Sequence, residues 1–150
     1  YTNSGDNNIG DEAADLIAAL PILTYLSIRT YGDNLDDTKI TRRGLLTLCR
    51  LELTSLHIGT VISYIGNNSY GDEGALIVAR HLPSLQQLVN NKNELGWEGV
   101  AAIANSLTKL EELLIDDNSQ VRQSVTPLGR LPLLKELYAC TCDSMQRTPE

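Results

Sequence analysis

The sequence contains one phrase twice. NNIGDEAADLIAAL at 7–20 returns in altered form as NNSYGDEGALIVARHL at 67–82. Both copies join an Asn pair to a Gly-Asp-Glu turn and then to a segment rich in small and aliphatic residues. A catalytic loop has no reason to be duplicated, whereas stacked units repeat because one unit cannot bury its apolar face without neighbours. The duplication therefore predicts a chain built of stacked structural units.

A second phrase, Leu-x-x-Leu-x-apolar, recurs five times at spacings of 30, 32, 25 and 24 residues, with Asn as the last residue of one copy. Its alternation places apolar side chains on one face of a short strand. A helical pattern precedes each of the first four copies, and three of these patterns start with acidic residues, which suit a helix N-terminus. The phrases begin at Leu23, Leu53, Leu85, Leu110 and Leu134, and the predicted helices cover 11–20, 40–51, 72–82 and 97–107.

The spacing differences fall between strands and helices. The connection from Leu53 to Gly71 is seven residues longer than the one from Leu85 to Gly96, and the extra residues lie in or near 59–68. A connection that need not stack can lengthen freely, so we expect 59–68 to be a mobile or partner-contacting loop. In the fifth helical position, Pro and Gly within 124–131 predict a short or broken helix.

Composition narrows the class of protein. The 150 residues, 42% apolar and 21% charged, suit one folded domain over 1–150, and 5% aromatic residues with no Phe imply an aliphatic core. A net charge of −7 argues against a nucleic-acid partner. No apolar run is long enough for a membrane span, and residues 1–20 lack a signal-peptide pattern. Three Cys residues without disulfide-rich spacing fit a reducing compartment or a processed secreted chain, and of these we expect a cytoplasmic location.

The segment LQQLVNNKNELGWEGVAAIANSLTKLEELLIDDN follows the pattern LxxLxIxxNxxGxEGAxxLAxxLxxL. This pattern resembles leucine-rich repeats of the ribonuclease-inhibitor type, and the resemblance covers nearly all of 7–142. It implies an α/β solenoid of five to six units, with strands on the concave face, helices on the convex face, and a protein partner bound along the strands. The Gly-Asp-Glu-Gly-Ala wording is also similar to repeats of bacterial proteins that act on host cells, which would place the chain in the host cytosol.

Several single residues allow two interpretations. Cys140 and Cys142 could form a metal or redox pair, but Cys142 stands where other units have Asn, and the resemblance implies a structural role in the inner turn. Cys49 is expected to be a small buried hydrophobe. Asn90 replaces an apolar strand residue and must find a hydrogen-bond partner if buried. Trp97 is expected to pack between neighbouring units rather than to serve as an exposed anchor.

Candidate partner-binding residues follow from the strand alternation, because the side chains that point away from the helices share one surface. They are Tyr25, Arg29, His57, Gln87, Asn91, Lys92, Glu112, Leu114, Asp116, Asp117, Glu136 and Tyr138. The first three strands contribute bases and no acid to this surface, and the last two contribute acids and no base. Gathered like charges repel, so this division predicts a basic partner unless neighbouring residues supply compensating cations.

Two functions remain open at this stage. The first is a protein-recognition module without enzymatic activity, cofactor or metal, since no phosphate loop, nucleophile elbow or ligand pair at helix spacing is present. The second is the substrate-targeting domain of a larger enzyme, such as a ligase-type bacterial effector. The chain starts partway through a unit, which suggests a fragment, and uncapped ends predict end-to-end self-association.

Overall fold

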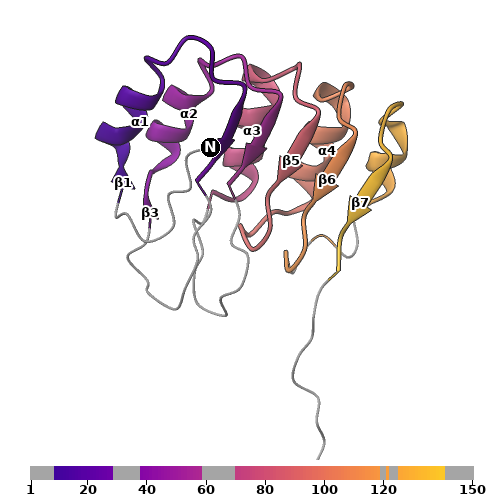
Figure 1. Ribbon diagram of the computed structural model, residues 1–150. Coiled ribbons are helices and arrows are strands. Elements are labelled where there is room, and N and C mark those ends of the chain that lie inside the picture. Colours follow the sequence, from indigo (N-terminus) through magenta and orange to yellow (C-terminus); the bar gives the residue numbers. More distant parts are fainter. Residues whose placement is uncertain (1–8, 29–37, 59–69, 119–120, 122–124, 141–150) are drawn as a thin grey trace, which may run out of the picture.

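The centre of the molecule is a five-stranded parallel sheet whose strands follow one another in sequence order (Figure 1). The computed structural model describes residues 9–28, 38–58, 70–118, 121 and 125–140. All neighbouring strands pair in parallel and without offset between equivalent positions of the repeated phrase. The strands are β2 (Tyr25–Ser27), β4 (Ser55–His57), β5 (Gln87–Val89), β6 (Glu112–Leu114) and β7 (Glu136–Tyr138).

The helices lie along one side of this sheet (Figure 1). A short parallel pair, β1 (Ile9–Gly10) with β3 (Thr38–Lys39), forms a second sheet beside the first two helices. The helices are α1 (Asp11–Ile17), α2 (Arg42–Leu48), α3 (Gly71–His81), α4 (Trp97–Ser106) and the 3₁₀ helix η2 (Thr126–Arg130). Each helix and the next strand of the five-stranded sheet are called a unit below. The architecture is thus α/β, with helices and parallel strands alternating along the chain.

The core lies between the helices and the sheet and is almost entirely aliphatic. The middle residue of each of the first four strands is a fully buried Leu. Tyr70 is the exception to the aliphatic rule, and its hydroxyl donates a hydrogen bond to the carbonyl oxygen of Ile40 at 2.9 Å. Burial raises the pKa of Tyr70 far above the ordinary phenol value, so the hydroxyl stays protonated and keeps donating. At the last strand the equivalent position opens to water, since Leu137 is 42% exposed.

The repeated Gly-Asp-Glu turn has a structural role that spans two units. Asp72 Oδ1 accepts hydrogen bonds from the backbone N–H groups of Gly96 (2.7 Å) and Gly99 (2.9 Å), at the start of the next helix, α4. In the first copy, Asp11 accepts bonds from the backbone N–H and the hydroxyl of Thr41, where α2 begins. Asp72 therefore supplies the cap that α4 lacks, and a cap contributes about 0.5–2 kcal/mol. At α2 the cap is the side chain of Thr41, which accepts from the backbone N–H of Arg43, and Asp11 holds that Thr41 in place.

Buried asparagines hold the turns that follow the strands. Asn118 Oδ1 accepts from the N–H groups of Asn93 and Leu95 in the preceding unit, both at 2.9 Å. Its amide nitrogen donates to the carbonyl oxygens of Asn90 and Ile115. Asn90 itself is buried, and its Oδ1 accepts a 2.6 Å hydrogen bond from Asn93 Nδ2, which confirms that this residue needs a side-chain partner. The amides thus tie consecutive turns together.

Most predicted elements are confirmed, with differences at their ends. The helices expected over 11–20 and 40–51 are shorter, Asp11–Ile17 and Arg42–Leu48, and the expected short helix in 124–131 is the 3₁₀ helix η2. Cys49 is buried, as expected. The prediction for Trp97 is wrong, because its side chain is 62% exposed. The proposed loop at 59–68 and most of 29–39 lie outside the described residues.

The exposure of Trp97 has a physical reason. Trp97 is the second residue after Leu95, as Asp72 is the second after Tyr70, so both stand at the position that reaches toward the helix of the next unit. Asp72 finds α4 there. Trp97 precedes a unit whose described helical segment is the five-residue η2, which offers a shorter surface to cover an indole ring.

Candidate functional site

The side of the sheet away from the helices is called the strand face, and it consists of the first and third residue of each strand. Because the pairing has no offset, these residues form two rows across the sheet. The first row is Tyr25, Ser55, Gln87, Glu112 and Glu136, and the second is Ser27, His57, Val89, Leu114 and Tyr138.

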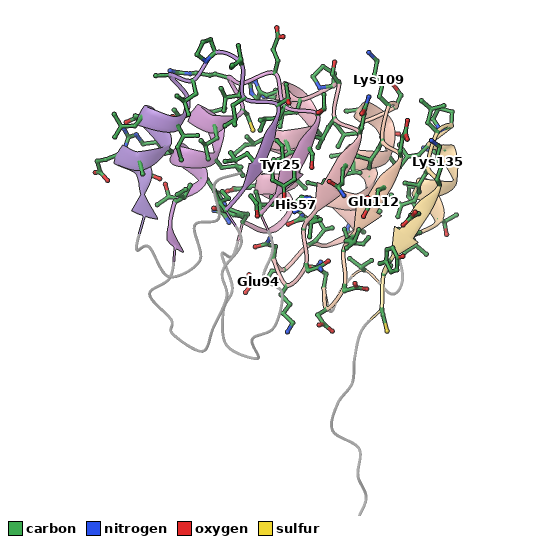
Figure 2. All side chains as sticks on the ribbon, in the orientation of Figure 1. Tyr25, His57, Glu94, Lys109, Glu112 and Lys135 are labelled. Atoms are coloured by element: carbon green, nitrogen blue, oxygen red, sulfur yellow. The ribbon has the colours of Figure 1, made fainter. Side chains whose placement is uncertain are left out.

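Hydrogen bonds connect polar side chains across four strands of this face (Figure 2). His57 Nε2 lies 2.9 Å from Gln87 Oε1, and an amide oxygen only accepts, so Nε2 carries a proton. In the neutral ring Nδ1 then accepts, and it faces the hydroxyl of Tyr25 at 3.4 Å. On the other side, Gln87 Nε2 donates to Glu112 Oε2 at 2.6 Å. The Tyr25, His57 and Gln87 chain therefore orients the carboxylate of Glu112.

Ser55 is a further member of this network; the strand alternation places it on the same surface, although it is not among the candidate partner-binding residues. Its hydroxyl donates to Gln87 Oε1 and lies 3.3 Å from His57 Nε2. The signal that could have identified it is its place in the strand phrase, which is the place of Gln87 and Glu112 in later copies. Ser55 helps to keep the Gln87 amide in the orientation that serves Glu112.

The second row of the strand face is buried on the first three strands and becomes exposed on the last two. In the second row, His57 is only 7% exposed and Val89 is buried, whereas Leu114 is half-buried and Tyr138 is 51% exposed. His57 is therefore covered, and its role on this face is to hold the side chain of Gln87. The most exposed part of the strand face lies on β6 and β7 and is called the acidic end, made of Glu112, Leu114, Glu136 and Tyr138.

Two carboxylates stand side by side at the acidic end. Glu112 and Glu136 are register partners on adjacent strands, and like charges placed so are mutually destabilising. Among the described residues, no Lys or Arg lies within ion-pair distance of either carboxylate; Lys135 instead pairs with Glu111 at 2.7 Å. The hydroxyl of Tyr138 lies 3.4 Å from Glu136 Oε2 and donates to it. The fold leaves this pair of negative charges open to an external cation.

The residues that follow the strands behave differently from the acidic end. Lys92 and Asp117, both with left-handed backbone conformation at φ 52° and 56°, form an ion pair at 3.6 Å. Asp116 Oδ1 accepts from the backbone N–H of Cys140, and the Oδ1 of Asn91 accepts from the N–H of Asp116. The compensating cation considered from the sequence is thus present for Asp117. Arg29, the other predicted base, lies outside the described residues.

Other features of the described part of the chain concern metal sites, membrane-spanning helices and reactive cysteines. No group of three His, Cys, Asp or Glu residues is placed there to hold a metal ion, and no described helix is long and apolar enough to cross a membrane. Burial raises the pKa of the Cys49 thiol to about 12, which keeps it protonated and unreactive. Cys140 is exposed, and its predicted companion Cys142 lies outside the described residues.

Comparison with protein-family models and with curated protein sequences finds no match to this chain.

Proposed function

We propose that this chain is a protein-recognition module of the leucine-rich-repeat type, and that its partner binds the acidic end of the strand face through Lys or Arg side chains. Parallel strands in chain order, helices on one side and buried Asn residues in successive turns support the repeat assignment. An extended face built from one strand per unit is the kind of surface that repeat proteins use for binding.

The observation that carries the proposal is the juxtaposition of Glu112 and Glu136 without a described counter-ion. Stability alone does not favour two adjacent carboxylates, since separating them would relieve their repulsion. A partner cation placed between them interacts with both charges at once. Glu112 is already oriented by Gln87, so less side-chain freedom is lost when the cation binds.

Apolar contact accompanies the charges. Tyr138 is half exposed and Leu114 is half-buried beside it, in register on adjacent strands. Tyr is enriched among the residues that dominate binding energy, because its ring gives a large contact area at low entropic cost and its hydroxyl can still hydrogen-bond. The acidic end thus combines an apolar anchor with a polar rim, the usual composition of a protein interface.

Site-specific photo-crosslinking tests the proposal. A benzophenone amino acid is introduced at Tyr138, or, as a matched control, at the exposed Ser106 on the helix side of the molecule. We expect a specific protein adduct from position 138 and none from position 106. Equal adducts from both positions would contradict binding at the acidic end.

A charge-reversal pair then tests the role of the carboxylates. Glu112→Lys with Glu136→Lys is compared with Glu12→Lys and Glu98→Lys, which change the net charge equally but lie on helices. The adduct at position 138 should disappear in the first double variant and persist in the second, with both retaining the circular dichroism of the original chain. Persistence in both would show that the carboxylates do not hold the partner.

A further inference from the structure

A groove of about 520 Å³ lies on the helix side of the molecule, between α2 and α3. It is remote from the strand face, because the helices that line it cover the opposite side of the sheet (Figure 1). Its floor and walls include Leu46, Leu76 and Ile77, and cationic side chains stand around them. The principal cations are Arg42, Arg43 and Arg80.

The groove has an origin in the repeat itself. Asp11 in α1 and Asp72 in α3 each accept hydrogen bonds at the start of the helix of the next unit, and Arg42 takes the equivalent position in α2. An Arg side chain cannot accept a hydrogen bond from backbone N–H groups. Arg42 instead donates from Nε to the carbonyl oxygen of Tyr70 at 3.2 Å. A long side chain replaces a short carboxylate at this joint, and α2 has 7 residues beside the 11 of α3, which leaves space between the two helices.

Charge in the groove is opposite to that of the whole chain. The net charge of the protein is −7, yet three Arg residues and one carboxylate, Glu73, line the groove. Arg42 pairs with Glu73 at 2.7 Å, and Arg43 pairs with two carboxylates of α1, Asp15 at 3.3 Å and Asp11 at 3.7 Å. Within the described ranges, Arg80 has no carboxylate at ion-pair distance. The end of the groove near the C-terminus of α3 therefore keeps an uncompensated positive charge.

Apolar side chains between these cations remain in contact with water. Leu46 is 43% exposed and Leu76 is 44% exposed, although both belong to well-formed helices with buried neighbours. Exposed leucines on facing helices, rimmed by charges, mark a surface suited to an apolar partner side chain. Covering them would remove apolar area from water, which is favourable.

We propose that this groove is a docking site for an acidic amphipathic helix of a partner protein. The α3 side of the groove runs from Glu73 to His81, which spans roughly 12 Å and matches two to three turns of an incoming helix. Apolar residues of that helix, spaced one turn apart, pack against Leu46 and Leu76. A carboxylate of that helix meets Arg80 near the C-terminus of α3, in the helix-in-groove mode of recognition.

Local charge favours such a helix over an extended polyanion. A nucleic acid or an anionic membrane would meet the whole field of a protein with net charge −7, whereas a short helix meets mainly the three Arg residues around the groove. The apolar floor adds a second requirement that a simple anion does not satisfy.

Fluorescence anisotropy with three labelled 14-residue peptides tests the proposal. The first carries Leu at helical spacing flanked by Glu, the second has Lys in place of every Glu, and the third is a scramble of the first. The acidic amphipathic peptide should bind at least about ten-fold more tightly than either control and should weaken with added salt. Absence of binding, or equal binding of the Lys peptide, overturns the proposal.

Variants of the exposed residues test whether the peptide binds in the groove. Arg80→Glu, and separately Leu46→Ser with Leu76→Ser, should each weaken the acidic peptide by about ten-fold or more. Lys109→Glu, an exposed cation beyond the end of α4, should leave it unchanged. These side chains are at the surface, so the variants keep the fold, and circular dichroism verifies this. Unchanged affinity in the Arg80 and Leu variants overturns the proposal.

Other occupants give different results in the same set of variants. If the chain alone self-associates in sedimentation runs and Arg80→Glu abolishes this, the occupant is a second copy and the proposal fails. If vesicles of phosphatidylglycerol bind the chain and Arg80→Glu abolishes that binding while the peptide does not compete, the groove serves a membrane and the proposal fails as well.

Discussion

Replacement of Asp72 removes one carboxylate that holds two units together. In Asp72→Ala, the N–H groups of Gly96 and Gly99 lose their acceptor at the start of α4. An N-terminal cap contributes about 0.5–2 kcal/mol, and hydrogen bonds to a charged acceptor belong near the upper end of that range. We expect a loss of about 2 kcal/mol in the free energy of unfolding. For a chain of this size that corresponds to a fall of about 4–8 °C in Tm.

Two further variants separate the cap from other effects. Asp72→Asn keeps an acceptor oxygen without the charge and should lose about half as much stability. Glu73→Ala removes the neighbouring carboxylate, whose ion pair with Arg42 is exposed to solvent, and should cost less than about 1 kcal/mol. Thermal and urea unfolding followed by circular dichroism measure all three. Equal midpoints for Asp72→Ala and Glu73→Ala would refute the assignment of a cap that spans two units.

Three other predictions concern pH, steric fit and the ends of the sheet. Burial disfavours ionisation of Asp11, but hydrogen bonds from Thr41 outweigh this effect and lower the pKa of Asp11 in the folded chain. The ionised carboxylate therefore stabilises the fold above the ordinary pKa of 3.8, and this contribution is lost as pH falls through the lower folded pKa. It should be missing from the acid unfolding curve of Asp11→Asn. Gly99→Ala would place a methyl group 2.6 Å from Asp72 Oδ1 and should lower the free energy of unfolding in urea by about 1–3 kcal/mol. The control Gly129→Ala meets nothing within 4 Å and should change it by less than about 0.5 kcal/mol. Equal costs for the two variants would contradict this steric explanation. Light scattering over a concentration series should show self-association, since Leu16 is 75% exposed at one end of the molecule and Leu137 is 42% exposed at the other. Leu16→Ser should reduce the self-association. A monomer at high concentration would contradict this prediction.

The strands could be predicted from the sequence because each one lies in a copy of a repeated phrase. The Leu-x-x-Leu phrase predicts all five strands because its middle apolar residue must face the helices in every unit, and the structure buries that residue in the first four. The cap that spans two units was not predictable from propensity. The acidic start of α3 suggested favourable interaction with its own helix, but Asp72 serves α4 instead, since stacking brings that N-terminus within reach.

The positions of the candidate residues on the sheet were more predictable than the pairing of their charges. Equal places in the repeated phrase put Gln87, Glu112 and Glu136 on one row, as the register confirms. The sequence did not reveal that Lys92 neutralises Asp117, because that pairing depends on left-handed backbone turns after two different strands. Exposure of individual side chains also depends on neighbouring units, which is why Trp97 was assigned to the interior.

The groove between α2 and α3 was not expected from the sequence. Its residues are ordinary surface residues of two helices, and Arg42 departs from the repeated Asp, as Trp97 does in α4. A single substitution in a repeat is hard to interpret before the helices are placed, because the same Arg could equally serve as a surface charge. Its contact with the carbonyl oxygen of Tyr70 shows that it also bridges the two units.

The association rate of the partner identified by crosslinking at position 138 is the most direct test of binding at the acidic end. Stopped-flow measurements compare the original chain with Glu112→Lys and Glu136→Lys combined, at low and high salt. Since facing charges act mainly on encounter, the double variant should slow association by about ten-fold or more at low salt, and the two proteins should converge as salt is raised. An association rate unchanged by the double variant, with its fold intact, would contradict the proposal that these carboxylates receive the partner.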